Sequence, residues 1–374
     1  MIGQTVNMSG KRITYSLSRW ALATWFAVVL ALPSQADYDW GLPDWLDPPP
    51  VPADNPVTEE KVALGQRLFF ELDLSGPRYM SCATCHEPAM GFSDGRETPV
   101  GVTGEFHSRN SMGLLNVAYQ GVLTWADPEL ETLEEQVRVP LFGINPIEMN
   151  VAGNEESVLN NLHCDPVYPV MFAAAFPEAD GVINYDLVAK ALATYVRVMV
   201  SATSPYDMYR YGGDETAVSE LAKRGEELFM SDRLNCSTCH TGIHFTDASP
   251  TPSYHNTGLY NVDGAGGLPE GNQGLFEHSG DAADIGRFRT PSLRNVALTA
   301  PYMHDGSLPD LDAVIDHYAA GGEAARLGDA SPLVSEHITG FELTDDERTG
   351  LIAFLESLTD EQFLADARFQ TPFQ

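Results

Sequence analysis

The stretch Cys82-Ala83-Thr84-Cys85-His86 occurs a second time, with one changed residue, as Cys236-Ser237-Thr238-Cys239-His240. Two thiols about one helical turn apart can reach both vinyl groups of one porphyrin, and the adjacent histidine then lies under the iron as its proximal ligand. A zinc site built from both cysteine pairs is the alternative, but zinc gives no reason for the histidine after each pair. The repeat therefore predicts two covalently bound c-type haems. The expected attachment and proximal residues are Cys82, Cys85 and His86, and Cys236, Cys239 and His240.

The sequences that flank the two motifs also resemble each other. GQRLFF (Gly65–Phe70) precedes the first motif and GEELFM (Gly225–Met230) precedes the second. LLNVAY (Leu114–Tyr119) follows the first motif, and LRNVAL (Leu293–Leu298) follows the second at a larger separation. One duplicated unit, elaborated twice and with a larger insertion in the second copy, explains these echoes.

The chain of 374 residues is long enough for two or three domains. Helix caps at Thr58, Ser219 and Thr344 and a weak strand signal favour a mainly α fold with long loops, including a loop over residues 251–286. We expect two cytochrome c-like haem domains related by duplication. The expected divisions are a signal peptide over residues 1–36, a Pro-rich strap over 37–56, a first haem domain over 57–210, and a second over 211–374 that includes a C-terminal tail.

The first residues are typical of a secretory signal peptide. Basic residues precede an apolar run over residues 21–32, and Ser34-Gln35-Ala36 supplies small residues at the cleavage positions. The run is too short for a stable membrane anchor. Export to the periplasm also suits haem attachment to cysteines, which takes place outside the cytoplasm.

The net charge of the chain limits the possible partners, and one cysteine remains outside the two motifs. The formal net charge of −32 excludes nucleic acid as a partner, and it leaves open simple solubility or attraction of a cationic or metal-loaded partner. Cys164 lies outside both motifs, and we expect a free buried cysteine there.

The opposite face of each iron decides the chemistry of a haem protein. A thioether suits electron transfer, an open position admits peroxide, and a phenolate favours higher iron oxidation states. Spacing does not choose among the candidate ligands, which are Met90, His107, Met149, His244, His255, His278, Met303, His304, His317 and Tyr318. Tyr318 shares one helical stripe with Leu311, Val314 and Ile315, so it points inward either as a core residue or as a ligand, whereas His317 points away from that stripe.

Three longer segments resemble those of a known protein family. RFRTPSLRNVALTAPYMHDG (residues 287–306), LEEQVRVPLFGINPIEM (133–149) and ALATYVRVMVSATSPYD (191–207), with the two CxxCH motifs, resemble the bacterial dihaem cytochrome c peroxidase and MauG family. The resemblance covers nearly all of residues 57–358. Within the family, the chain looks most similar to MauG-like enzymes, including the methanobactin-associated MbnH group.

The resemblance implies a distal ligand for the second haem. The family takes this ligand from the helix after the PYxHDG segment, as methionine in the peroxidases and tyrosine in MauG. The matching position is Tyr318. Met303 lies inside the PYxHDG segment, where the family takes no ligand, and His317 is a neighbour on the other helix face.

The resemblance also implies that the first haem meets peroxide. The family's distal glutamine, proline and glutamate match Gln136, Pro140 and Glu148, although a short insertion separates the last two. A carboxyl group over the iron can move a proton between the peroxide oxygens. The classical peroxidases have a histidine where this chain has Val102, so we expect an open site, with nearby His107 as a possible ligand or a second-layer residue.

Two further features of the family lie between its haems. Trp125 resembles the tryptophan through which charge passes, with a packed core tryptophan as the alternative. Asn110 with the backbone oxygens of Thr299 and Pro301 resembles the family's calcium site, and such hard oxygen donors suit calcium. The expected cofactors are thus two covalently bound haems c and one calcium ion.

Three functions are consistent with these features. The leading hypothesis is a periplasmic MauG-like enzyme that uses hydrogen peroxide to form a high-valent dihaem state and oxidises a residue of a partner protein. By resemblance to the MbnH group, that residue is a tryptophan of a copper-related periplasmic protein. The alternative is a conventional peroxidase that reduces hydrogen peroxide to water with electrons from a small cytochrome c or cupredoxin. A non-enzymatic electron carrier with both irons six-coordinate is the third.

Overall fold

The computed structural model describes residues 38–373. The predicted signal peptide over residues 1–36 lies outside this range. No helix between residues 38 and 373 is long and apolar enough to cross a membrane.

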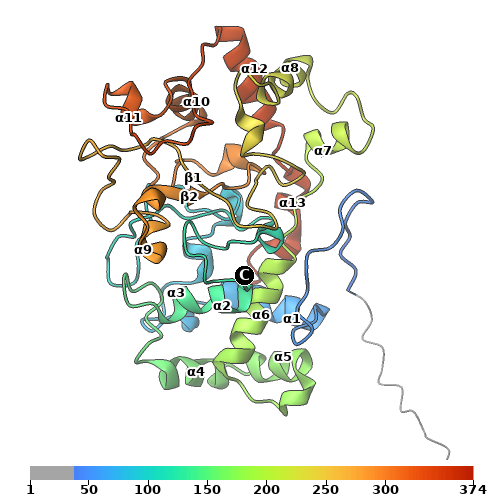
Figure 1. Ribbon diagram of the computed structural model, residues 1–374. Helices are drawn as coiled ribbons and strands as arrows, with labels where there is room; N and C mark the ends of the chain where they lie inside the picture. The colour runs from blue at the N-terminus through green and yellow to red at the C-terminus, as the bar shows by residue number, and fades with distance from the viewer. Residues whose placement is uncertain (1–37, 374) are drawn as a thin grey trace, which may run out of the picture. The chain divides into compact units, whose positions relative to one another are not determined.

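The described chain is mainly helical, as the sequence predicted, with long loops between the helices (Figure 1). Its two strands, β1 (Tyr254–Asn256) and β2 (Arg287–Arg289), pair antiparallel with His255 opposite Phe288. The α-helices are α1 (Glu59–Phe69), α2 (Leu133–Gln136), α3 (Arg138–Phe142), α4 (Glu155–Cys164), α5 (Val167–Ala175), α6 (Tyr185–Arg197), α7 (Pro205–Arg210), α8 (Glu220–Phe229), α9 (Phe276–Ser279), α10 (Leu311–Ala319), α11 (Glu323–Arg326), α12 (Asp345–Glu356) and α13 (Glu361–Ala365). The 3₁₀ helices are η1 (Leu72–Leu74), η2 (Cys82–Thr84), η3 (Pro88–Met90), η4 (Val117–Tyr119), η5 (Pro177–Ala179), η6 (Cys236–Thr238), η7 (Ala282–Asp284), η8 (Val296–Leu298) and η9 (Ala367–Phe369).

The first hydrophobic core forms around the packed helices α1 and α6. Thr58 caps α1 by accepting a hydrogen bond from the amide of Lys61, and the apolar stripe of α1 is buried. Gly65 allows the close approach of α6, because a β-carbon at this position would lie 2.1 Å from the carbonyl oxygen of Ala191.

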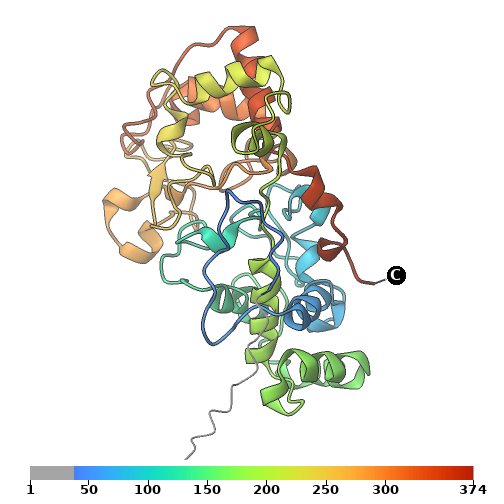
Figure 2. The ribbon, with the colours of Figure 1, turned by 90° about the vertical axis from the view of Figure 1, so that its right-hand side faces the viewer.

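The second core forms in the same way around α8 and α12. Ser219 caps α8, and Thr344 forms a capping box with Glu347 at the start of α12. A β-carbon on Gly225 would lie 1.9 Å from the carbonyl oxygen of Gly350, so this contact parallels the one at Gly65. Figures 1 and 2 both show α8 and α12 at one end of the described unit and α4 and α5 at the other.

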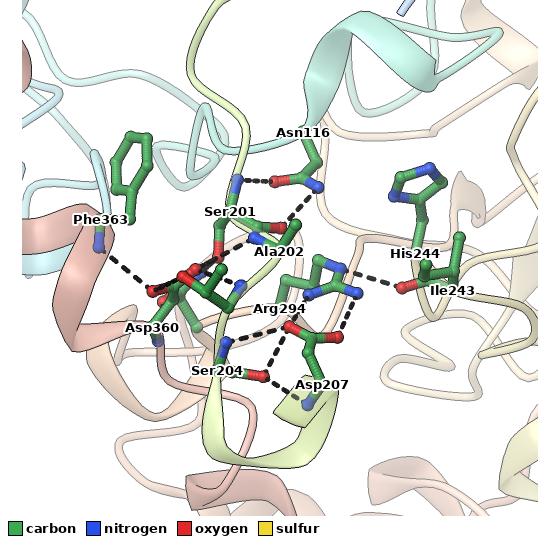
Figure 3. A network of polar contacts seen from close by, with 12 residues as sticks. Asn116, Ser201, Ala202, Ser204, Asp207, Ile243, His244, Arg294, Asp360 and Phe363 are labelled. Carbon is green, nitrogen blue, oxygen red and sulfur yellow. Dashed lines mark hydrogen bonds and ion pairs between the residues drawn. The ribbon is translucent and has the colours of Figure 1, made fainter. Parts of the chain in front are cut away.

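A buried polar network joins the two cores (Figure 3). Asn116 exchanges two hydrogen bonds with the backbone of Ser201, at 2.8 and 2.9 Å. Asn295, at the matching place in the second echo, accepts from the amide of Asp360 at 2.8 Å. The Ser201 hydroxyl donates to the Asp360 carboxylate at 3.1 Å, so the segments that follow α6 and α12 meet there.

The same network contains a fully buried ion pair. Arg294 binds the carboxylate of Asp207 with both terminal nitrogens at 2.8 Å, and these side chains are 1% and 0% exposed. Asp207 also accepts from the backbone and the hydroxyl of Ser204 at the start of α7. The Arg294 Nε donates to the carbonyl of Ile243 at 2.9 Å, which ties down the loop after the second CxxCH motif.

Two segments of the chain were predicted to be irregular, residues 37–56 and 251–286. Residues 38–56 contain no helix or strand, and Trp45 attaches this segment to the linker by donating to the carbonyl of Ala202 at 3.2 Å. The expectation of an unstructured loop over residues 251–286 is partly wrong, because β1, α9 and η7 lie within it. β1 forms there because its partner β2 comes from residues 287–289, a pairing that periodicity cannot reveal.

Candidate haem sites

The second CxxCH motif opens onto a large cavity. Cys236 begins η6 and Cys239 directly follows it, and the amide of His240 donates to the carbonyl of Cys236 at 3.0 Å, so the turn brings the histidine beside the thiols. Cys236, Cys239, His240 and Tyr318 all line this cavity. The structure thus brings the predicted distal residue to the same cavity as the predicted attachment residues.

Both predicted proximal histidines have a backbone partner for their Nδ1 atom. The Nδ1 of His86 lies 2.8 Å from the carbonyl oxygen of Phe92, and the Nδ1 of His240 lies 3.1 Å from that of Phe245. A carbonyl accepts only from a protonated nitrogen, so each ring keeps its Nε2 lone pair free. Histidine ligands of metals commonly have such a partner on the other nitrogen. These residues therefore fit a haem iron at each motif.

Tyr318 lies on α10, near its C-terminal end. Burial raises the pKa of the Tyr318 phenol above its usual range, and the nearby Cys239 and Cys236 thiols add to the effect. Tyr318 lines the cavity wall. A phenol at this wall fits a ligand that binds an iron within the cavity.

His317 is fully buried but does not line the cavity. Its Nδ1 accepts a hydrogen bond from the amide of Glu323 at 2.9 Å, which holds the ring on the other side of α10. This agrees with the predicted helix face. Burial lowers the pKa of His317 to about 4, so the imidazole is neutral at pH 7.

Three of the other candidate ligands also line the cavity, namely His255, Met303 and His304. The Nε2 of His255 lies 2.6 Å from the Asp247 carboxylate, whose hydrogen bond raises the pKa of His255 to about 10. His304 stacks on Phe288 with ring centroids 3.7 Å apart. The cavity lining does not include Met90, His107, Met149, His244 or His278.

Around the first motif, the structure brings Glu148 near the predicted attachment cysteines. Burial raises the pKa of Cys82 and of Cys85 to about 12, and the Glu148 charge contributes to both shifts. Burial raises the pKa of Glu148 itself to about 7, although its side chain is 28% exposed. A carboxyl with this pKa can both accept and donate a proton near neutral pH.

Two of the other predicted distal positions, Pro140 and Val102, have backbone contacts with the Glu148 segment. The Oε1 atom of Gln136 is buried without a hydrogen-bond partner among the described residues. The amide of Met149 donates to the carbonyl of Pro140 at 3.1 Å, so the insertion does not separate Pro140 from the Glu148 segment. The amide of Val102 donates to the carbonyl of Glu148 at 3.0 Å, which puts an apolar side chain next to this segment.

His107 also lies in this region, with its Nε2 3.6 Å from the Glu148 Oε1. Burial lowers the pKa of His107, so this contact joins a carboxyl to a largely neutral imidazole at pH 7. His107 is therefore a neighbour of the carboxyl group.

Trp125 and the predicted calcium residues line the same cavity as the second motif. The indole Nε1 of Trp125 donates to the carbonyl of Asn110 at 2.8 Å. Asn110 uses its Nδ2 to bind the carbonyls of Arg96 and Glu97, which leaves its Oδ1 as an oxygen donor. Thr299 and Pro301, the other two residues of the predicted calcium site, line the same cavity.

Comparisons with known proteins agree with this geometry. The family model described as "Di-haem cytochrome c peroxidase" matches residues 59–216. The methylamine utilization protein MauG of Methylorubrum extorquens is 39% identical over 312 residues, covering 83% of this chain and 82% of MauG. The chain belongs to the dihaem cytochrome c peroxidase and MauG family. It is therefore a haem-dependent oxidoreductase that acts on peroxide, and the family implies two haems c.

Both branches of this dihaem family are among the relatives. The cytochrome c551 peroxidase of Pseudomonas aeruginosa is 33% identical over 308 residues, covering 82% of this chain and 81% of that protein. A crystal structure described as a MauG-like protein associated with microbial copper homeostasis is 42% identical, with a TM-score of 0.86. That likeness covers 90% of this chain and all of the other.

Sequence reasoning missed two arginines that line the cavity of the second motif, Arg289 and Arg294. Both lie in the RFRTPSLRN segment, but nothing in their spacing shows that they are buried, at 3% and 4% exposure.

The prediction of a free, buried Cys164 was correct about the free thiol and wrong about burial, because this cysteine is exposed. It is the last residue of α4, where the helix end is open to solvent.

Proposed function

We propose that this protein is a MauG-like enzyme, which uses hydrogen peroxide to oxidise a residue of a partner protein. The observation that carries the proposal is Tyr318, which lines the cavity together with Cys236, Cys239 and His240. A phenolate is a hard donor that stabilises oxidised iron, whereas the methionine of an electron-transfer haem favours the reduced state. The likeness to the MauG-like copper-homeostasis structure supports this branch of the family.

The bound haems would supply peroxide reduction at one iron and storage of the oxidising equivalents over both. Glu148 would take a proton from the peroxide oxygen next to the iron and return it to the leaving oxygen. Gln136 would orient the peroxide with its otherwise unpartnered amide oxygen. Pro140 and Val102 keep the surroundings apolar, and Trp125 would carry charge between the haems.

The proposed partner is a periplasmic protein with a copper-related role, and its target residue is a tryptophan. The description of the MauG-like relative as associated with copper homeostasis supports the first point. The strong negative charge of this chain favours a partner with a cationic or metal-loaded surface. The predicted signal peptide supports a periplasmic location for the proposed reaction.

We also propose a calcium ion at Asn110, Thr299 and Pro301, and an origin of the two halves by duplication. The amide of Asn116 donates to the carbonyl of Met199 after α6, and the amide of Asn295 donates to that of Leu358 after α12. These matching contacts, together with the matching helix pairs, support two copies of one cytochrome c-like unit.

The test adds one equivalent of hydrogen peroxide to the fully ferric protein and follows its absorption and Mössbauer spectra. We expect the wild type to react without prior reduction and to form a long-lived oxidised state. Tyr318→Met should shorten the lifetime of that state by at least about tenfold, because a thioether sulfur stabilises oxidised iron less than a phenolate oxygen does. Tyr302→Phe, another tyrosine of the cavity wall, is the matched control and should behave like the wild type. An unchanged response of Tyr318→Met would remove Tyr318 from the mechanism.

The alternative function is that of a conventional peroxidase with a small cytochrome c or cupredoxin as electron donor. The contact between His107 and Glu148 favours it, because a histidine beside the distal carboxyl could close the site in the ferric state. A ferric protein that ignores peroxide until it is half-reduced would support this alternative.

A further inference from the structure

Arg289 is a buried cation that has no carboxylate partner within the described chain. It lies on β2 and is 3% exposed. Its Nε donates to the carbonyl of Thr124 at 3.0 Å, one terminal nitrogen donates to the side-chain oxygen of Gln120, and the other lies 2.8 Å from the Met112 sulfur. All three partners are neutral. No aspartate or glutamate among residues 38–373 lies within ion-pair distance of it.

A buried charge is stable only when another charge or several strong hydrogen bonds compensate it. Burial lowers the pKa of Arg289 to about 10, so the guanidinium is still charged at neutral pH. The folded chain therefore holds one cation that favours the binding of an anion.

The position of Arg289 indicates which anion this is. Arg289 lines the same cavity as Cys236, Cys239 and His240, where the family implies a haem. Arg294 lines the cavity as well, but Asp207 already occupies both of its terminal nitrogens. A haem carries two propionates on one edge, and a guanidinium binds a carboxylate through two parallel hydrogen bonds.

We propose that Arg289 binds a propionate of the second haem and holds Trp125 in place beside it. The amide of Arg289 donates to the carbonyl of Trp125 at 2.8 Å, while its side chain binds the carbonyl of Thr124, the preceding residue. One residue thus fixes both the haem edge and the backbone of the tryptophan. This inference rests on the proposed haem at the second CxxCH motif, with His240 as its proximal ligand.

The test compares Arg289→Leu and Arg289→Lys with the wild-type holoprotein. Resonance Raman spectra report the propionate bending band of the haem, and a redox titration reports the midpoint potential of each haem. Arg289→Leu should shift this band and lower the potential of the second haem, because an uncompensated carboxylate favours ferric iron. Arg289→Lys should also shift the band, because an ammonium group cannot form the two parallel hydrogen bonds of a guanidinium. The change in potential should be smaller than in Arg289→Leu, because lysine keeps the positive charge.

Arg109→Leu is the matched control. Arg109 lies over the ring of Phe288, the neighbour of Arg289 on β2, but it already pairs with Glu277 at 2.9 Å and does not line the cavity. We expect the propionate band of Arg109→Leu to equal that of the wild type.

Two outcomes would overturn the proposal. The first is a propionate band that stays unchanged in Arg289→Lys, a variant that keeps the charge and is therefore expected to fold. The second is an Arg289→Leu protein that is less stable but has wild-type bands and potentials, which would make Arg289 purely structural. A separate His240→Gly variant tests the iron ligation by His240. If its second haem kept a wild-type electron paramagnetic resonance signal, the assignment of His240 as proximal ligand would be wrong whatever the Arg289 variants do.

Discussion

Burial changes the acid–base behaviour of Glu148, the residue that we propose as the proton carrier. Its pKa rises to about 7, so near neutral pH a fraction of the molecules carries the carboxylate that can accept a proton from peroxide. We expect the rate of reaction with peroxide to rise with pH through about 7. Glu148→Gln should lower this rate by about 10²–10⁴-fold and remove the inflection. Stopped-flow measurements between pH 5 and pH 9 (about two units either side of the pKa) would check this.

Glu129→Gln is the control for Glu148, since Glu129 is exposed. A second readout is stability. Because folding raises the pKa of Glu148, its contribution is fully present below the unfolded pKa and is lost as pH rises through about 7. The free energy of unfolding of Glu148→Gln should therefore fall less over this range. A wild-type pH profile in Glu148→Gln would contradict the proposed role.

At the scale of elements, glycines on α1 and α8 allow two helix pairs to touch. Gly225→Ala would force a methyl group against the carbonyl oxygen of Gly350, at 1.9 Å in the present geometry. Overpacking of this kind costs about 1–3 kcal/mol, and a backbone clash puts this variant at the upper end. Chemical denaturation should show the loss. Glu227→Ala, on the exposed face of the same helix, should change stability by less than about 0.5 kcal/mol.

Helix starts were more predictable than helix ends. The caps at Thr58, Ser219 and Thr344 are where the sequence predicted them, because a cap is a local hydrogen bond between neighbours in sequence. The apolar pattern of the sequence predicts that the first of these helices runs to about Glu71 and the last to Leu358, whereas α1 ends at Phe69 and α12 at Glu356. These ends depend on what the following segment binds, which local sequence does not contain.

At the scale of the whole molecule, the buried Asp207–Arg294 pair ties α7 to the loop after the second CxxCH motif. Asp207→Asn would leave the guanidinium buried without its counter-charge, which costs about 3–5 kcal/mol. We expect a matching drop in the free energy of unfolding. Asp312→Asn breaks an ion pair with Arg348 in which Asp312 is 61% exposed, and it should cost less than about 1 kcal/mol. Equal losses in the two variants would mean that the buried pair does not hold the fold.

The two halves differ at this point. In the matching echoes LLNVAY and LRNVAL, Leu115 stands where the second half has Arg294. Leu115 is buried in the first core, so the first half has an apolar contact where the second half has the ion-paired Arg294. Arg294 thus belongs to the half that also contains Tyr318.

The amino-acid sequence alone determined the two haem motifs, the helix caps, the mainly helical class and the family. Each of these depends on residues close together in the chain or on a pattern shared with relatives. The sequence also named the residues of the candidate sites, but only folding could bring Tyr318 to the cavity of the second motif and Glu148 to the first. Tertiary structure alone decided that Arg289 is buried without a carboxylate and that Cys164 is exposed. Burial and charge compensation depend on segments far apart in the chain, which only the packed molecule brings into contact.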